Sequence, residues 1–159
     1  MPNTATHILR RTALAALLAT ASAAILANTT PAWAADRLVD ITAIVDHPAL
    51  DAVREGAKES LKEAGFEEGK NLQVKFQSAQ GNVSTAAQIA RKFVGDSPDV
   101  IVAISTPSAQ TVVAATSTIP VVYSAVGDPV AAKLVPSWDA SGTNVTGVSD
   151  MVPADKQLP

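Results

Sequence analysis

The sequence contains no cysteine and only two histidines, His7 and His47. Without cysteine there can be no disulfide, no thiolate metal site and no lipid anchor attached to a cysteine. His47 is the only histidine beyond the N-terminal leader described below, so no histidine cluster is available for a metal ion. No G-x-G-x-x-G phosphate-binding pattern is present either. We therefore expect neither a metal site nor a cofactor.

Aromatic residues and basic residues are also scarce. Three Phe, two Trp and one Tyr occur in 159 residues, so this chain does not fully supply an aromatic-lined pocket. Without Arg10 and Arg11 of the leader, ten basic side chains face fifteen acidic ones, a net charge of −5. A surface of this sign argues against binding to nucleic acid or to an anionic membrane.

The first 34 residues have the organisation of a secretory signal peptide. A short basic start is followed by an uncharged run rich in Ala and Leu, from Ala13 to Ala27, and then by small residues up to Ala34. This run is shorter than the roughly 20 residues that a membrane-spanning helix needs. We expect cleavage after Ala34 and export to the periplasm. What remains, about 125 residues, is a usual size for one domain.

After the leader, apolar runs alternate with amphipathic segments. Short strands are predicted at 38–45, 71–77, 100–104, 119–124 and 144–148, and helices at 49–64, 83–94, 107–116 and 129–135. Strands that alternate with helices at this spacing predict an α/β fold with a doubly wound parallel sheet.

The segment 98–108 carries the clearest site signal. The unbroken apolar run Val100–Ile104 is typical of a strand buried on both faces. Thr106 and Pro107 then read as the N-cap and the first residue of a helix. In an open α/β sheet such a turn lies at the carboxyl ends of the strands, where ligands bind. The N–H groups of Ser108 and Ala109 would face an anionic group there.

The turns after the first four strands should line one rim of the sheet. Most of the side chains that they present are neutral hydrogen-bonding groups, and this chemistry suits holding a small polar molecule better than transforming it. The candidate ligand-binding residues are His47, Gln80, Ser105, Thr106, Ser108 and Asp128. Each also has an ordinary structural role open to it: His47 can hydrogen-bond to backbone, and Asp128 can cap a helix.

An enzyme of the exported α/β class is the alternative from the same residues. Ser105, His47 and Asp128 could be drawn as a catalytic triad, but no G-x-S-x-G elbow surrounds any serine. A sugar ligand is a further alternative. Recognition of a carboxylate at the helix that begins near Ser108 favours an amino acid instead.

Several segments, taken in order, resemble one protein family. They are Ile41 to Gly56, Glu68–Asn71, Ala79–Asn82, Ile89–Phe93, Ser105–Pro107, Gly127–Val130 and Asn144–Ser149. Together they are similar to the substrate-binding proteins of ABC transporters of the tryptophan/tyrosine-type uptake family. The resemblance implies a periplasmic-binding-protein fold of type I-like lobes, an aromatic amino acid as ligand, and an ABC permease with its ATPase as partner.

Length is where the chain departs from that family, whose members are about twice as long as the mature chain and have two lobes of ordinary domain size. We expect residues 36–150 to form the N-terminal lobe and residues 151–159 to start a truncated crossover helix. A lone lobe should bind its ligand weakly, and a truncated product with no independent function is the third alternative.

Overall fold

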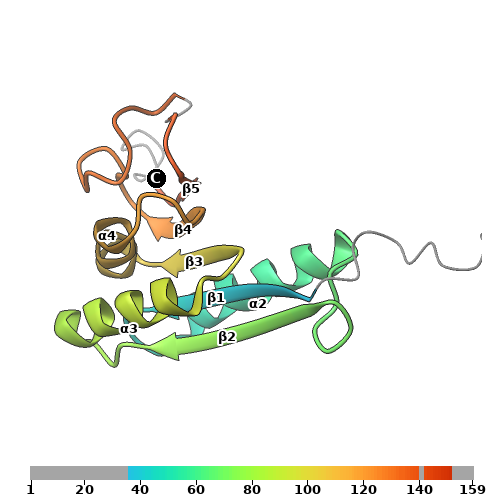
Figure 1. Ribbon diagram of the computed structural model, residues 1–159. Coiled ribbons are helices and arrows are strands. Elements are labelled where there is room, and N and C mark those ends of the chain that lie inside the picture. The colour runs from blue at the N-terminus through green and yellow to red at the C-terminus, as the bar shows by residue number, and fades with distance from the viewer. Residues whose placement is uncertain (1–35, 140–141, 152–159) are drawn as a thin grey trace, which may run out of the picture. The chain divides into compact units, whose positions relative to one another are not determined.

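The computed structural model describes residues 36–139 and 142–151, so the predicted leader and the predicted crossover helix lie outside the described residues. Five strands form one sheet in the order β2-β1-β3-β4-β5, and every neighbouring pair is parallel (Figure 1). The elements are β1 (Arg37–Ala43), α2 (Pro48–Glu63), β2 (Leu72–Ser78), α3 (Val83–Asp96), β3 (Val100–Ile104), α4 (Thr106–Ala115), β4 (Val121–Val126) and β5 (Val145–Ser149).

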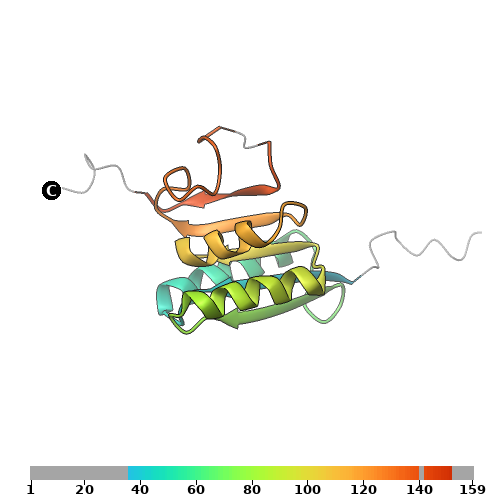
Figure 2. The same ribbon diagram turned by 60° about the vertical axis from the view of Figure 1, so that its left-hand side comes forward.

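Helices cover both faces of the sheet, as a doubly wound fold requires. Figure 2 shows α3 and α4 on the near side of the strands and α2 behind them. The α2 face is packed by alternate residues of β1, such as Val39 and Ile41, against Leu50 and Val53. The opposite face is packed by Phe93 and other residues of the two remaining helices. The predicted fold class is therefore confirmed.

Most predicted elements are present with small shifts at their ends, and one is wrong. Residues 129–133 form a turn and not the start of a helix to residue 135. The amide N–H of Ala132 donates to the carbonyl of Asp128, and that of Leu134 donates to the carbonyl of Pro129. Lys133 then takes a φ of 59°, a conformation that an α-helix does not accommodate, so the turn cannot continue.

Of the helices in the described ranges, none combines the length and the apolar character that a bilayer crossing requires.

Candidate functional site

The carboxyl ends of the strands lie along one edge of the sheet, which we call the carboxyl edge. The chain leaves β1 toward β2 on one side, and it leaves β3 toward β4 on the other side. The strand order therefore reverses between β1 and β3, and ligands of open α/β sheets bind at such a point. His47 and Ser105 lie in the two turns that flank it.

His47 is the N-cap of helix α2, and it lies in the turn after β1, which is hydrogen-bonded to the turn after β2. Its Nδ1 accepts a hydrogen bond from the amide N–H of Ala49, at 3.2 Å, so the side chain caps the helix. The preceding residue, Asp46, accepts a hydrogen bond from Gln80 Nε2 at 2.6 Å, and the N–H of Gly81 donates to the carbonyl of Ile44, also at 2.6 Å. Two predicted residues, His47 and Gln80, are thus brought into adjacent, mutually bonded turns. Asp46 was missed as a site residue, although the sequence places it directly before His47.

Ser105 takes an unusual backbone conformation at the end of the central strand. Its φ is 85° and its ψ is 153°, a region that glycine visits and that costs other residues about 1–3 kcal/mol. Its amide N–H donates to the carbonyl of Ser124 at 2.9 Å, which fixes the turn against β4. Strain of this kind persists only where the surrounding structure enforces it, and it gathers at functional sites.

Helix α4 starts one residue earlier than predicted. Ser105, not Thr106, is the N-cap, so Thr106 and Pro107 are the first two helical residues. The N–H of Ala109 is also not free for an anion, because it donates to the carbonyl of Ser105 at 3.0 Å. Proline is accommodated at either of the first helical positions, since the N–H groups there have no acceptor within the helix.

Ser108 lies beneath the rim and not on it. The residue is fully buried, and its Oγ lies 3.4 Å from the Oγ of Ser105. Ser105 is also largely buried, at 9% exposed, so a ligand at the edge meets the half-buried Thr106 first. Helical spacing explains the difference, because Ser108 shares the inward face of α4 with Ala109 and Val112.

Asp128 lies beyond the end of β4 and holds the turn that follows. Its Oδ1 accepts hydrogen bonds from the N–H groups of Val130, at 3.0 Å, and Ala131, at 2.9 Å. The capping role expected for Asp128 is therefore present, although the capped segment is a single turn. The neighbouring carbonyl of Gly127 accepts a hydrogen bond from Ser149 Oγ at 2.6 Å, which ties this turn to β5.

The carboxyl edge is thus a row of linked turns with hydroxyl, amide, imidazole and carboxylate groups. Bonds join the turn after β2 to the turn after β1, and the end of β3 to β4. Such a row can orient a small polar molecule through several hydrogen bonds. Among the described residues the side chains of Ser105, His47 and Asp128 bond elsewhere: His47 Nδ1 accepts from Ala49, and Asp128 Oδ1 accepts from Val130 and Ala131.

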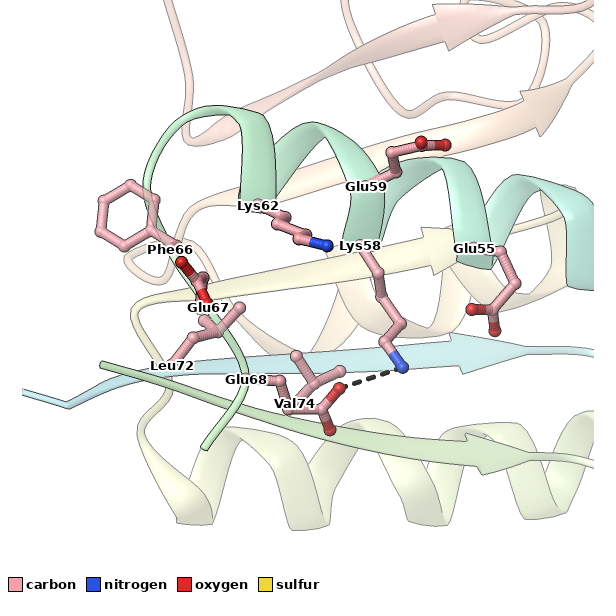
Figure 3. A pocket seen from close by; sticks show the side chains of 9 residues that line it. All are labelled: Glu55, Lys58, Glu59, Lys62, Phe66, Glu67, Glu68, Leu72 and Val74. Carbon is pink, nitrogen blue, oxygen red and sulfur yellow. Dashed lines mark ion pairs between the residues drawn. The ribbon is translucent and has the colours of Figure 1, made fainter. Parts of the chain in front are cut away.

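A separate groove lies far from this edge in the fold, between α2 and the edge strand β2 (Figure 3). It has a volume of about 500 Å³ and an apolar floor that includes Phe66 and Leu72. Its walls carry charges of both signs, and one pair spans it, with Lys58 Nζ 3.0 Å from Glu68 Oε2. Charges of alternating sign on an exposed helix face are typical of a solvated surface, and we assign no function to this groove.

Comparison with known proteins relates this sequence and fold to one family. The sequence model of the family described as ABC transporter substrate binding protein matches residues 38–159. A curated relative, the tyrosine-binding protein of Clostridioides difficile (strain R20291), is 45% identical over 120 residues, which are 76% of this chain and 35% of the relative.

Solved structures agree with this match. A conserved domain protein from Vibrio cholerae is 54% identical, with a TM-score of 0.74 over 76% of this chain and 40% of that one. The ligand-free, open structure of a substrate-binding protein with adhesive properties from Clostridium difficile is 49% identical. Its TM-score is 0.74 over 76% of this chain and 41% of that one. An ABC domain in complex with L-Trp from Streptococcus pneumoniae is 34% identical. Its TM-score is 0.73 over 77% of this chain and 41% of that one. The chain spans about two fifths of these structures.

Proposed function

We propose, since the chain belongs to the ABC transporter substrate-binding protein family, that it is the N-terminal lobe of an importer's solute-binding component and that its ligand is an aromatic amino acid. The observation that carries this proposal is the row of bonded, polar turns at the topological switch point, with the strained Ser105 at its centre. Relatives named for tyrosine and solved with L-Trp support the ligand class.

In this proposal each polar group of the carboxyl edge has a defined task. Gln80, His47 and Thr106 donate or accept hydrogen bonds to the polar end of the amino acid, and Ser105 presents its hydroxyl from the fixed turn. Asp128 supplies negative charge near the far end of the row, which suits an ammonium group. The aromatic ring would pack against groups beyond this lobe, because the lobe offers few aromatic side chains.

Membership of the family supports a proposal for location and partners. Its members act outside the cytoplasm. We place this chain in the periplasm after removal of the leader 1–34, without a lipid anchor, where it would deliver its ligand to an ABC permease. Residues 36–150 form the lobe, and residues 151–159 begin the crossover toward a second lobe. We assign the chain no enzymatic activity and no nucleic-acid partner.

The affinity of this chain alone is expected to be low. A ligand held at a micromolar dissociation constant is bound by about 8 kcal/mol. If each of two lobes contributes about half, one lobe retains about 4 kcal/mol, which corresponds to about millimolar binding.

A thermal unfolding panel tests this function. L-tyrosine or L-tryptophan at about ten times a millimolar dissociation constant should stabilise the lobe by about 1.4 kcal/mol, a shift of several degrees in the unfolding midpoint. L-leucine and glucose should produce no shift. Gln80→Ala should reduce the shift, whereas Gln88→Ala, an exposed glutamine on α3 away from the edge, should not.

Three results would contradict the proposal. A shift with the sugar alone would change the ligand class. No shift with any compound would remove binding by this lobe. Turnover of ester substrates that disappears in Ser105→Ala would favour the enzyme.

A further inference from the structure

Asp40 is a buried acid for which the proposed binding function has no use. It lies in the middle of β1, between β2 and β3, and it is completely buried. Neither of its carboxylate oxygens has a hydrogen-bond partner among the described residues. Thr42 lies two residues further along the same strand, is 1% exposed, and has an Oγ1 without a partner in the same ranges.

Both side chains point to the same face of the sheet. Alternate residues of a strand face opposite sides, and Val39 and Ile41 pack on the α2 side. Asp40 and Thr42 therefore face α3. Three oxygen atoms without donors in an apolar layer are costly, and an ionised carboxylate there costs far more than a protonated one.

The charged groups that act on Asp40 come from two elements and are engaged with each other. Lys75 is the residue of β2 in register with Asp40, but its Nζ lies 3.1 Å from Asp96 Oδ2 at the end of α3. Lys92 Nζ lies 2.7 Å from the same oxygen. From β3, the residue in register is the apolar Ile101. The nearest cation is thus already paired with another carboxylate.

The net result of burial and of these charges is a raised pKa for Asp40. Burial raises the pKa of Asp40 above its ordinary value, the positive charges of Lys75 and Lys92 lower it, and the negative charge of Asp96 raises it further. A protonated Asp40 carboxyl group also carries an O–H donor. It lies on the α3 side of the sheet, where Thr42 Oγ1 has no hydrogen-bond partner among the described residues.

We propose that the Asp40 carboxyl group is a buried proton-binding site that couples the stability of this lobe to pH. The folded chain then holds a proton at pH values where an aspartate of the unfolded chain has lost it. Between the pKa of Asp40 in the unfolded chain and its higher pKa in the folded chain, the folded state binds more protons than the unfolded state. The free energy of unfolding therefore rises as the pH falls through this range. Above the pKa of Asp40 in the folded chain, the carboxyl group is ionised in both states, and its burial destabilises the fold.

Urea unfolding of the full chain from about pH 4 to about pH 8 tests this, with Asp40→Asn as a variant of nearly equal shape that cannot titrate. The unfolding constant of the wild type, divided by that of the variant, should rise with pH by up to about tenfold per pH unit and then level off. Glu59→Gln, on the exposed side of α2, should give a ratio without this rise. A constant ratio for Asp40→Asn, or one that falls as pH rises, would overturn the proposal.

Lys75→Gln provides an independent test. Without the ammonium that opposes protonation, the pH at which the ratio levels off should move upward, and a downward move would contradict the proposed role of Asp40.

A titration of the wild type by carboxyl-carbon NMR does not depend on how the variants fold. The Asp40 signal should titrate above the value of about 3.9 that is typical of aspartate. A midpoint at or below that value would show that Asp40 is ionised and stabilised in the fold, which would refute the proposal.

Discussion

The two edges of the sheet are built differently. At the carboxyl edge, Gln80, Ser105 and Ala125 all have positive φ values, of 53°, 85° and 54°. Within the described ranges no ion pair joins the turns there, and side chains such as His47 and Gln80 are exposed. This edge keeps strained backbone and polar groups that are accessible to a ligand.

At the opposite, amino edge, an ion pair and side-chain hydrogen bonds hold the turns, although Ser97 in the turn before β3 also has a positive φ, of 53°. Arg37 pairs with Asp99 at 2.7 Å, and a second oxygen of Asp99 accepts a hydrogen bond from the N–H of Leu38 at 2.8 Å. Asn71 joins two backbone groups in the loop before β2, and Asn144 Nδ2 donates to the carbonyl of Ile119 at 2.7 Å. We expect the side-chain contacts of the amino edge to stabilise the fold more strongly, whereas the carboxyl edge presents the polar groups that we propose bind the ligand.

The largest effect on stability is expected from Asn144→Ala. The substitution leaves the half-buried carbonyl of Ile119 without its donor, and we expect a loss of about 2 kcal/mol in the free energy of unfolding. Asn82→Ala is the matched substitution at the carboxyl edge, where Asn82 caps α3 through the N–H of Thr85. It should cost about 1 kcal/mol. Urea unfolding measures both, and a larger loss at Asn82 would contradict the comparison.

At Ser105 the expected change has the opposite sign. Ser105→Gly relieves backbone strain of about 1–3 kcal/mol and adds about 0.5–1 kcal/mol of chain entropy cost, so the lobe should gain about 1 kcal/mol of stability. The same variant should bind L-tyrosine more weakly, because the hydroxyl is gone and glycine allows the residue other backbone conformations. Thermal unfolding and calorimetric titration measure the two quantities.

Ser105→Ala separates strain from hydroxyl chemistry. This variant keeps the Cβ atom, and therefore the strain, but loses the Oγ. It should lose about 1 kcal/mol of stability, because the buried Ser108 Oγ loses the hydroxyl 3.4 Å away, and its binding of L-tyrosine should fall. A Ser105→Gly protein that is less stable than Ser105→Ala would show that the turn is not strained in the way its φ indicates.

Much of the fold could be predicted because it depends on local pattern. The apolar run at 100–104 is buried from Ile101 onward, and the alternation at 72–77 lies in the edge strand β2. The helix expected at 129–135 was wrong because Asp128 and Pro129 give the same signal for a single turn as for a helix start. No local sequence pattern predicts that Lys133 adopts a left-handed backbone conformation.

The site was less predictable because its decisive features are non-local. The bond between Gln80 and Asp46 joins residues 34 positions apart. The conformation of Ser105 is imposed by its bond to Ser124 in the next strand, and serine itself has no preference for it. The helical spacing of Ser108 with Val112 could have predicted that Ser108 is buried. It was instead predicted to face a ligand because it follows the turn at the carboxyl end of the central strand.

The smallest effect is expected from Asp99→Asn at the amino edge. The hydrogen bond from Leu38 and the pairing with Arg37 lower the pKa of Asp99, so its charge stabilises the fold above the ordinary pKa of aspartate, and this contribution is lost as the pH falls through the lowered value. Asparagine can still accept from Leu38. The partly exposed pair should therefore contribute less than about 1 kcal/mol near neutral pH. Urea unfolding should show a difference between the two proteins at about pH 7 that disappears at about pH 2. A difference that persists in acid would mean that Asp99 acts through its shape and not its charge, and the amino edge would then owe its stability to hydrogen bonds alone.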